Sequence, residues 1–276
     1  MKFKCSYHKE SVSLSKLFTL ISIVVLIIVT AFLSLIILTI VVEGISHLIK
    51  AMTSAEVCFS LRLSLITASI STLICILLAV PSSYALTRTT VPFRKLANIM
   101  IELPLSLPYI VLGLSLLMLF SSDLGKFLRD IGFKVIFNMK GIVIAHVAVN
   151  LPFMIRLIKT AFNEVDIRLE HIAGTLGASK FQRFSTITLP MSRNAIINAA
   201  ILAWSRALGE FGATLMLVGV TRMKTETLPA SIYLSISTGE NETAMATAAI
   251  LLTVSCCSLI VTSFLNRKTH SRNKVS

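Results

Sequence analysis

Long apolar segments separated by short polar stretches dominate this chain of 276 residues. The first, at residues 17–42, contains no charged residue, and at about 1.5 Å per helical residue it can cross a hydrocarbon core of roughly 30 Å. A signal peptide has a shorter apolar core and a small-residue cleavage site, so we interpret this segment as a retained span. Five more spans are predicted, at residues 63–86, 96–120, 141–161, 194–220 and 244–265.

Polar residues and prolines interrupt two of these predicted spans. Glu102, Pro104 and Pro108 break the third, because proline lacks the N–H that a continuous helix needs. Glu102 is either solvated at the membrane interface or part of a gate. The fourth span contains His146 and Asn150, and the imidazole is either a hydrogen-bond donor between helices or a proton relay.

Residues 121–140 are predicted to lie on the membrane surface rather than to cross the bilayer. Their apolar side chains fall on one face of a short helix, and these are Leu124, Phe127, Leu128 and Ile131. Six spans and this surface helix predict an all-α, polytopic membrane protein. Residues 1–276 then form one transmembrane domain, and residues 1–16 and 266–276 lie on the same side of the membrane.

Composition and charge support this interpretation. The chain is 55% apolar with a mean hydropathy of +0.84, whereas soluble domains are about 45–50% apolar. The net charge of +13 resides in short loops between spans, which is typical of the positive-inside rule and not of a nucleic-acid-binding groove. Most Lys and Arg residues lie on the side of the termini and of residues 163–190. We therefore expect a cell-membrane protein with both termini in the cytoplasm.

The sequence carries no motif for catalysis or for binding a cofactor. Five cysteines lack the paired spacing of a metal site. No G-x-x-x-x-G-K-[ST] run and no His-Glu-x-x-His run occurs. We expect a non-catalytic subunit without a metal or cofactor of its own, so any ATP and Mg²⁺ must be bound by a partner polypeptide.

Residues 163–190 form a polar island that predicts two short helices joined by a turn. Asn163 and Asp166 suit a capping box at the start of the first helix. Gly177 suits the left-handed conformation that ends a helix. An apolar stripe with helical spacing lies between them, made of Val165, Leu169, Ile172, Ala173 and Leu176.

The second short helix is predicted to start at a capping box of Ser179 and Gln182 and to stop before Pro190. It carries Phe181 and Phe184 among polar neighbours. Aromatic side chains on an exposed helix are typical anchors for a partner protein. If transport is driven by ATP, this loop is the expected docking site for the motor subunit.

The fifth span contains Arg206 and Glu210, four residues apart on one predicted helical face. Ionisable groups at membrane depth are costly, so we expect the two to pair and either to line a path or to fix helix packing. Gly209 and Gly212 leave room beside them, and Thr214 follows. A ridge of small residues precedes the pair and faces either its own bundle or a second copy, at Ala195, Ala199, Ala203 and Ala207.

The 163–190 loop resembles the cytoplasmic coupling loop of ABC importer permeases. The family pattern is Glu-Ala-Ala, three residues, Gly, nine residues, Ile, one residue and Leu-Pro. This chain matches it at Gly177, Ile187, Leu189 and Pro190, whereas His171-Ile172-Ala173 replaces Glu-Ala-Ala and Glu170 stands one residue early. The resemblance implies that the ATPase contacts this loop, through Glu170, His171, Ala173, Gly177, Ala178, Ser179, Phe181, Phe184, Ile187, Leu189 and Pro190.

The runs from Arg206 to Thr214 and from Thr227 to Tyr233 resemble the permeases for molybdate, tungstate and sulfate. This resemblance implies a six-helix permease of type I architecture, two ATPase subunits, a second permease copy and an external oxyanion-binding protein. The expected path residues are Arg206, Gly209, Glu210, Gly212 and Thr214. A sulfate permease, and a secondary transporter driven by an ion gradient through Arg206, Glu210 and His146, are the alternatives.

Overall fold

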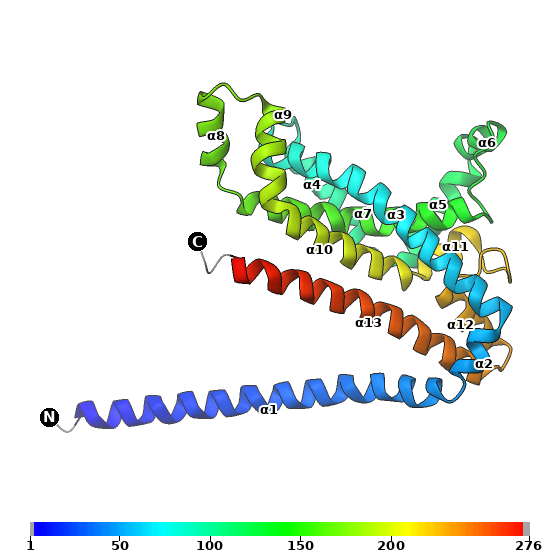
Figure 1. Cartoon of the computed structure of the whole chain (residues 1–276), viewed down its shortest axis with the longest axis horizontal. Helices are drawn as coiled ribbons and strands as arrows, with labels where there is room; N and C mark the ends of the chain where they lie inside the picture. The colour runs from blue at the N-terminus through cyan, green and yellow to red at the C-terminus, as the bar shows by residue number, and fades with distance from the viewer. Residues whose placement is uncertain (1–2, 273–276) are drawn as a thin grey trace.

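The computed structural model describes the backbone of residues 3–272 and the side chains of residues 16–260, and within these ranges it contains helices and no strand. Five helices are long (Figure 1): α1 (Phe3–Ile45), α3 (Ala55–Arg88), α7 (Met139–Glu164), α10 (Leu189–Leu208) and α13 (Asn241–Arg272). The shorter helices are α2 (Leu48–Thr53), α4 (Arg94–Glu102), α5 (Tyr109–Ser121), α6 (Asp123–Asp130), α8 (Ile167–Thr175), α9 (Lys180–Arg183), α11 (Gly212–Val218) and α12 (Leu228–Ser237).

The six predicted spans correspond to four straight candidate spans and two bent pairs of helices among the described residues. In the third span, α4 and the 3₁₀ turn η1 (Leu103–Ser106) meet α5 at 113°, which confirms the predicted break at the prolines. In the fifth, α10 and α11 meet at 57°. The sequence did not predict this second bend. It occurs where α10 ends at Leu208 and Gly209 follows with φ −91° and ψ 0°.

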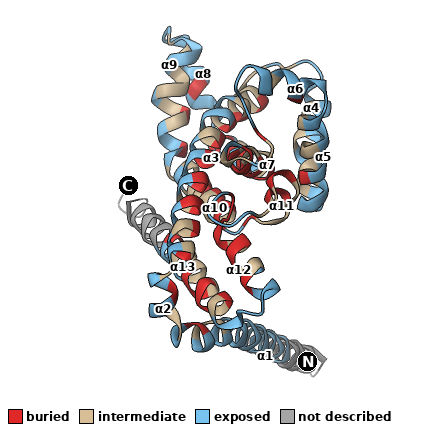
Figure 2. Cartoon of the chain, turned by 90° about the vertical axis from the view of Figure 1, so that its right-hand side faces the viewer, coloured by how far each residue is buried: buried red, intermediate tan, exposed pale blue. Residues whose placement is uncertain are grey.

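The packed centre of the bundle is formed by α3, α7 and α10, whose inner faces are buried (Figure 2). Ala199 and Ala203 of α10 lie in one cluster with Met154 and Phe162 of α7. Small residues let helix backbones approach closely. The small-residue ridge therefore packs largely within its own bundle, since Ala207 is also buried.

Helix α1 diverges from the rest of the chain (Figure 1). It meets α13 near its C-terminal end, where a Cβ on Gly44 would lie 2.6 Å from the Ala249 Cβ. Its most apolar stretch of 18 residues, within residues 16–45, has no residue buried against the rest of the described chain. The segment between the first two predicted spans is mostly helical, because α2 and the first turns of α3 occupy it.

The ends of the bundle differ in what they carry. The start of α1, the end of α13 and the pair α8–α9 lie at one end, and α2, α6 and α12 lie at the other (Figure 1). Polar contacts connect segments at the second end: His47 Nδ1 lies 3.3 Å from Glu242 Oε2, and Arg222 forms an ion pair with Glu56. The hydrogen bond that the Arg222 guanidinium donates to the Glu56 carboxylate raises the pKa of Arg222. The start of α1 and the end of α13 therefore lie on the same side of the bundle, as six spans predict.

Candidate functional site

Two regions hold the predicted functional residues, and the first is the loop between α7 and α10. Helix α8 begins after Asp166, whose side chain accepts a hydrogen bond of 2.9 Å from the Arg168 N–H. The predicted cap at Asn163 is wrong, because α7 continues to Glu164 and Asn163 lies inside its last turn. Of the two candidate caps, only Asp166 lies outside a helix and has the extended backbone that a capping residue needs.

The turn and the second capping box have the predicted geometry. Gly177 has φ +89°, in the left-handed region that glycine tolerates. The Gln182 N–H donates to Ser179 Oγ at 3.2 Å, and the Ser179 N–H donates to Gln182 Oε1 at 2.8 Å. This box starts α9 and confirms that part of the prediction.

The helix that starts at Ser179 does not stop before Pro190, contrary to the prediction. A π turn, η2 (Phe184–Thr188), joins α9 to α10, and the Leu189 N–H donates to the Phe184 carbonyl five residues earlier. Pro190 is then in the first turn of α10, directly after η2. Because the helix continues through this point, the missing N–H of proline removes one backbone hydrogen bond there. The loop and the fifth span therefore form one continuous helical path.

The two phenylalanines of this path differ in exposure. Phe181 is 76% exposed, as an anchor for a partner requires. The Phe184 ring instead packs into the core, with its centroid 4.8 Å from that of Tyr84 and 6.3 Å from that of Phe162. Phe184 therefore holds η2 against α3 and α7, and its ring is not free to anchor a partner.

Glu170 is the most constrained residue of the loop. Its carboxylate is buried and accepts hydrogen bonds from Arg88 Nε at 2.8 Å and from the Thr188 hydroxyl at 2.6 Å. Arg88 Nη2 also donates to the carbonyl oxygens of Phe162 and Val165, at 2.6 and 2.7 Å. One ion pair thus joins the ends of α3 and α7 to α8 and η2. We call Arg88, Glu170 and Thr188 the loop brace.

The outer side of the loop is apolar and open. Leu169 and Ile172 of α8, with Ile187 of η2 and Met191 of α10, line a groove with a volume of about 330 Å³. Leu176, at its edge, is 83% exposed. Ala173 also lines the groove, and both Ala173 and Ile187 are half-buried. Of the other predicted loop residues, those that are exposed are His171, Gly177, Ser179 and Pro190, and those that are half-buried are Ala178 and Leu189.

The second region is the junction between α10 and α11, where the expected ion pair is absent. Glu210 follows the end of α10, and its carboxylate accepts hydrogen bonds from the N–H groups of Ala213 at 2.8 Å and Thr214 at 3.1 Å, and from the Thr214 hydroxyl. The prediction failed because α10 ends at Leu208, so no helical turn joins Arg206 to Glu210. The carboxylate instead satisfies free N–H groups at the start of α11.

Arg206 has aromatic partners in place of a carboxylate. Its guanidinium carbon lies 4.3 Å from the centroid of the Phe153 ring, and Nη2 donates to the Tyr109 hydroxyl. No ion pair involves Arg206 among residues 16–260. Sequence reasoning missed Tyr109 and Phe153, because each lies on another helix.

The two bent spans touch at this junction. A Cβ on Gly212 would lie 3.2 Å from Ile110 Cγ1 and 3.4 Å from Tyr109 Cβ, and a Cβ on Gly113 would lie 2.6 Å from Ala213 Cα. Helix α5 begins at Tyr109, so the positive end of its dipole is beside the residue that holds Arg206. Discontinuous helices that meet within a membrane are a frequent architecture of ion-binding sites in transporters.

Comparisons with known proteins agree with this architecture. Residues 72–271 match the family model described as "Binding-protein-dependent transport system inner membrane component". The chain is 35% identical over 214 residues to the molybdenum transport system permease protein ModB of Escherichia coli (strain K12), covering 76% of this chain and 93% of that protein. It is 30% identical over 237 residues to the sulfate transport system permease protein CysW of Synechococcus elongatus, covering 84% of this chain and 82% of that protein.

A solved structure shows the same fold. A chain of a bacterial alginate ABC transporter, crystallised with its pentasaccharide-bound periplasmic protein, superposes with a TM-score of 0.65 at 19% identity. The superposition covers 83% of each chain. With the family match extending over most of the chain, the protein belongs to the inner-membrane components of binding-protein-dependent transport systems, the permease subunits of ABC importers.

Proposed function

We propose that this permease carries a tetrahedral oxyanion across the membrane, with molybdate as the first candidate and tungstate as its chemical analogue. The relative named for molybdenum transport is more similar in sequence than the relative named for sulfate transport, 35% against 30% identity. Sulfate has the same shape and charge, so it is the second candidate.

The observation that carries this proposal is the uncompensated charge of Arg206 where two bent spans meet. An oxyanion leaving water needs a cation and hydrogen-bond donors, but it must not be trapped. Arg206 offers a cation, Tyr109 a hydroxyl and α5 the positive end of a helix dipole. The Phe153 ring already stabilises the guanidinium, which moderates its attraction for the anion.

Gly209, Gly212 and Thr214 have supporting roles in this proposal. Gly209 ends α10 and lets the chain bend. Gly212 allows α11 to approach α5, since a side chain there would meet Ile110. The Glu210 carboxylate caps α11 and accepts a hydrogen bond from the Thr214 hydroxyl, so Glu210 holds the shape of the junction and does not neutralise Arg206.

Energy for transport comes, in this proposal, from separate ATPase subunits docked at the apolar groove of α8, η2 and α10. Exposed Leu176 lines that groove, and Phe181 is exposed on α9; apolar anchors of this kind suit a protein interface. The loop brace connects α8 to α3 and α7, so a displacement of the loop by the ATPase would move α3 and α7 with it. The chain itself then binds neither ATP nor Mg²⁺.

Assembly and orientation complete the proposal. A second permease copy pairs with this one, and α1 offers an apolar face that no other part of the described chain covers. The termini and the α8–α9 loop lie in the cytoplasm, as the excess of Lys and Arg at that end favours. An external oxyanion-binding protein delivers the ion to the opposite end.

Uptake by a reconstituted transporter tests the proposal. The permease, its ATPase and its binding protein are placed in proteoliposomes, and labelled molybdate uptake is measured with tungstate and sulfate as competitors. Arg206→Gln should lower uptake roughly tenfold or more, because losing a charged hydrogen-bonding group costs about 1.5–3 kcal/mol. Arg193→Gln, at an exposed position of the same helix, is the control. Normal uptake by Arg206→Gln would refute the path, and stronger competition by sulfate than by tungstate would favour the second candidate.

A further inference from the structure

A pocket outside both functional regions lies between the end of α5, helix α6 and residues 133–137. Its volume is about 390 Å³. Phe120, Phe133 and Phe137 form much of its wall, and the charged residues that line it are Arg129 and Lys134. No carboxylate lines it, so the pocket is apolar with two cations at its margin.

The two cations have no acidic partner among the residues whose side chains are described. No ion pair in the described part of the chain involves Arg129 or Lys134, whereas the neighbouring Lys126 is paired with Asp123 at 2.9 Å. Lys140 lies over the Phe133 ring, 5.0 Å from its centroid. An unpaired arginine and an unpaired lysine beside an apolar cavity are complementary to an anionic headgroup attached to an acyl chain.

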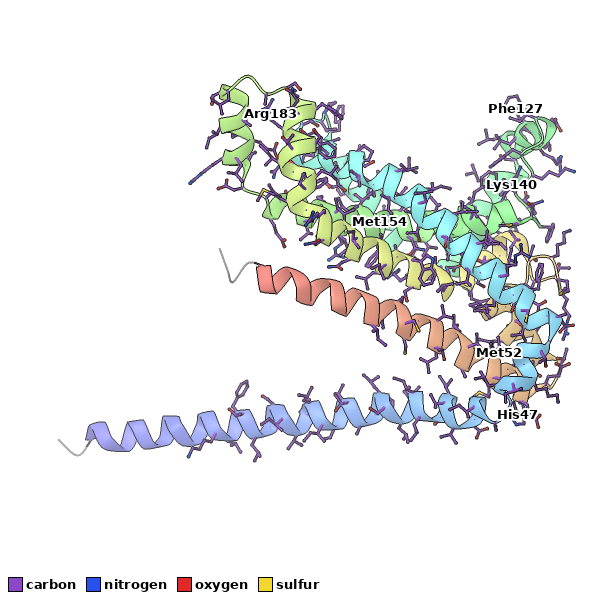
Figure 3. All side chains as sticks on the ribbon, in the orientation of Figure 1. His47, Met52, Phe127, Lys140, Met154 and Arg183 are labelled. Atoms are coloured by element: carbon purple, nitrogen blue, oxygen red, sulfur yellow. The ribbon has the colours of Figure 1, made fainter. Side chains whose placement is uncertain are left out.

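The surroundings of the pocket are equally apolar and exposed. Leu124, Phe127, Ile131 and Phe137 are 52%, 62%, 64% and 60% exposed. Helix α6 projects from the bundle at the end opposite α8 and α9 (Figure 1), and the labelled Phe127 and Lys140 mark this corner in Figure 3. Large apolar side chains beside cations, at the end of a transmembrane bundle, fit the boundary between lipid headgroups and acyl chains.

The segment is held in place well enough to keep a preformed pocket. Gly125 packs so closely on the end of α5 that a Cβ there would lie 1.7 Å from the Phe120 carbonyl oxygen. Val135 is buried and packs in one cluster with Ile142 and Val218. Both sides of the pocket are therefore anchored to the bundle.

From this geometry we propose that the α5–α6 pocket binds one anionic phospholipid. Arg129 and Lys134 contact the phosphate, the phenylalanine wall holds the first part of an acyl chain, and Phe127 and Ile131 insert beside it. The proposed orientation of the permease assigns this lipid to the outer leaflet. The binding itself depends on neither that orientation nor the transported ion.

The test measures lipid retained by the assembled transporter. The complex is purified from nanodiscs that contain phosphatidylglycerol and phosphatidylcholine with identical acyl chains, and bound lipids are counted by native mass spectrometry. The wild type should retain phosphatidylglycerol in preference to phosphatidylcholine. The double variant Arg129→Gln, Lys134→Gln should bind it roughly 30-fold more weakly, because each cation near an anionic headgroup contributes about fivefold.

Two matched variants complete the test. Lys126→Gln removes a cation of the same helix that does not line the pocket, and it should retain wild-type binding. The exchange Arg129→Lys, Lys134→Arg keeps both charges and should retain it as well. Equal retention by the double glutamine variant, or equal retention of phosphatidylcholine by the wild type, would overturn the proposal. The proposal would also be overturned if the double glutamine variant retained lipid normally but docked the external binding protein more weakly. The surface would then belong to that partner.

Discussion

Arg88 and Glu170 are 82 residues apart in the sequence and in contact in space, whereas Arg206 and Glu210 are four residues apart and bind different partners. The first pair is almost completely buried, with side chains that are 6% and 8% exposed. In the second, the carboxylate is buried against α11 and the guanidinium lies between the aromatic rings of two other helices.

The difference shows which charges are free to act on a third group. Arg88 donates to three acceptors, and Glu170 accepts from two donors, so the charges of this pair neutralise each other. Glu210 is likewise committed to backbone N–H groups. Of the two arginines, only Arg206 has no carboxylate or carbonyl partner in the described structure, and it therefore keeps charge that a passing anion can use.

Breaking the buried pair should have the largest effect. Arg88→Gln leaves the Glu170 carboxylate buried without its cation, which costs roughly 3–5 kcal/mol. We expect residues 165–188 to lose amide protection in hydrogen exchange and the binding protein to stop stimulating ATP hydrolysis. Arg94→Gln, at an exposed position of α4, is the control. Unchanged protection of the loop would show that the brace does not hold it.

A smaller effect is expected at the second glutamate. Glu210→Ala removes a cap from α11, which costs roughly 0.5–2 kcal/mol, and it leaves the contacts of Arg206 with Tyr109 and Phe153 in place. Hydrogen exchange should increase over residues 212–218 while most of the oxyanion uptake remains. Glu164→Ala, at an exposed position near the end of α7, should change neither. Complete loss of uptake in Glu210→Ala would assign the carboxylate a direct part in transport.

Local signals in the sequence were sufficient for features that depend on a few neighbouring residues. Ser179 with Gln182 gave the capping box, Gly177 the left-handed turn and Pro108 the bend of the third span. The predicted cap at Asn163 was wrong because both Asn163 and Asp166 are residue types that suit a helix cap. The end of α7 decides between them, and the burial of Phe162 in the core helps to set that end.

Features that depend on tertiary contacts could not be predicted in this way. No pattern joins Arg88 to a glutamate 82 residues later. A glycine within a span, such as Gly209, is often tolerated without a break, so spacing alone favoured a continuous helix and an Arg206–Glu210 pair. The partners of Arg206, Tyr109 and Phe153, become visible only when α5 and α7 are packed against α10.

Uptake by the double variant Arg206→Gln, Glu210→Gln, compared with Arg206→Gln alone at matched abundance, tests most directly whether Arg206 acts as a free cation. If Arg206 serves the passing oxyanion and Glu210 only caps α11, removing the second charge cannot restore what the first substitution lost, and both variants should transport equally poorly. Recovery of uptake in the double variant would show that the two charges neutralise each other, and it would contradict the role assigned to Arg206.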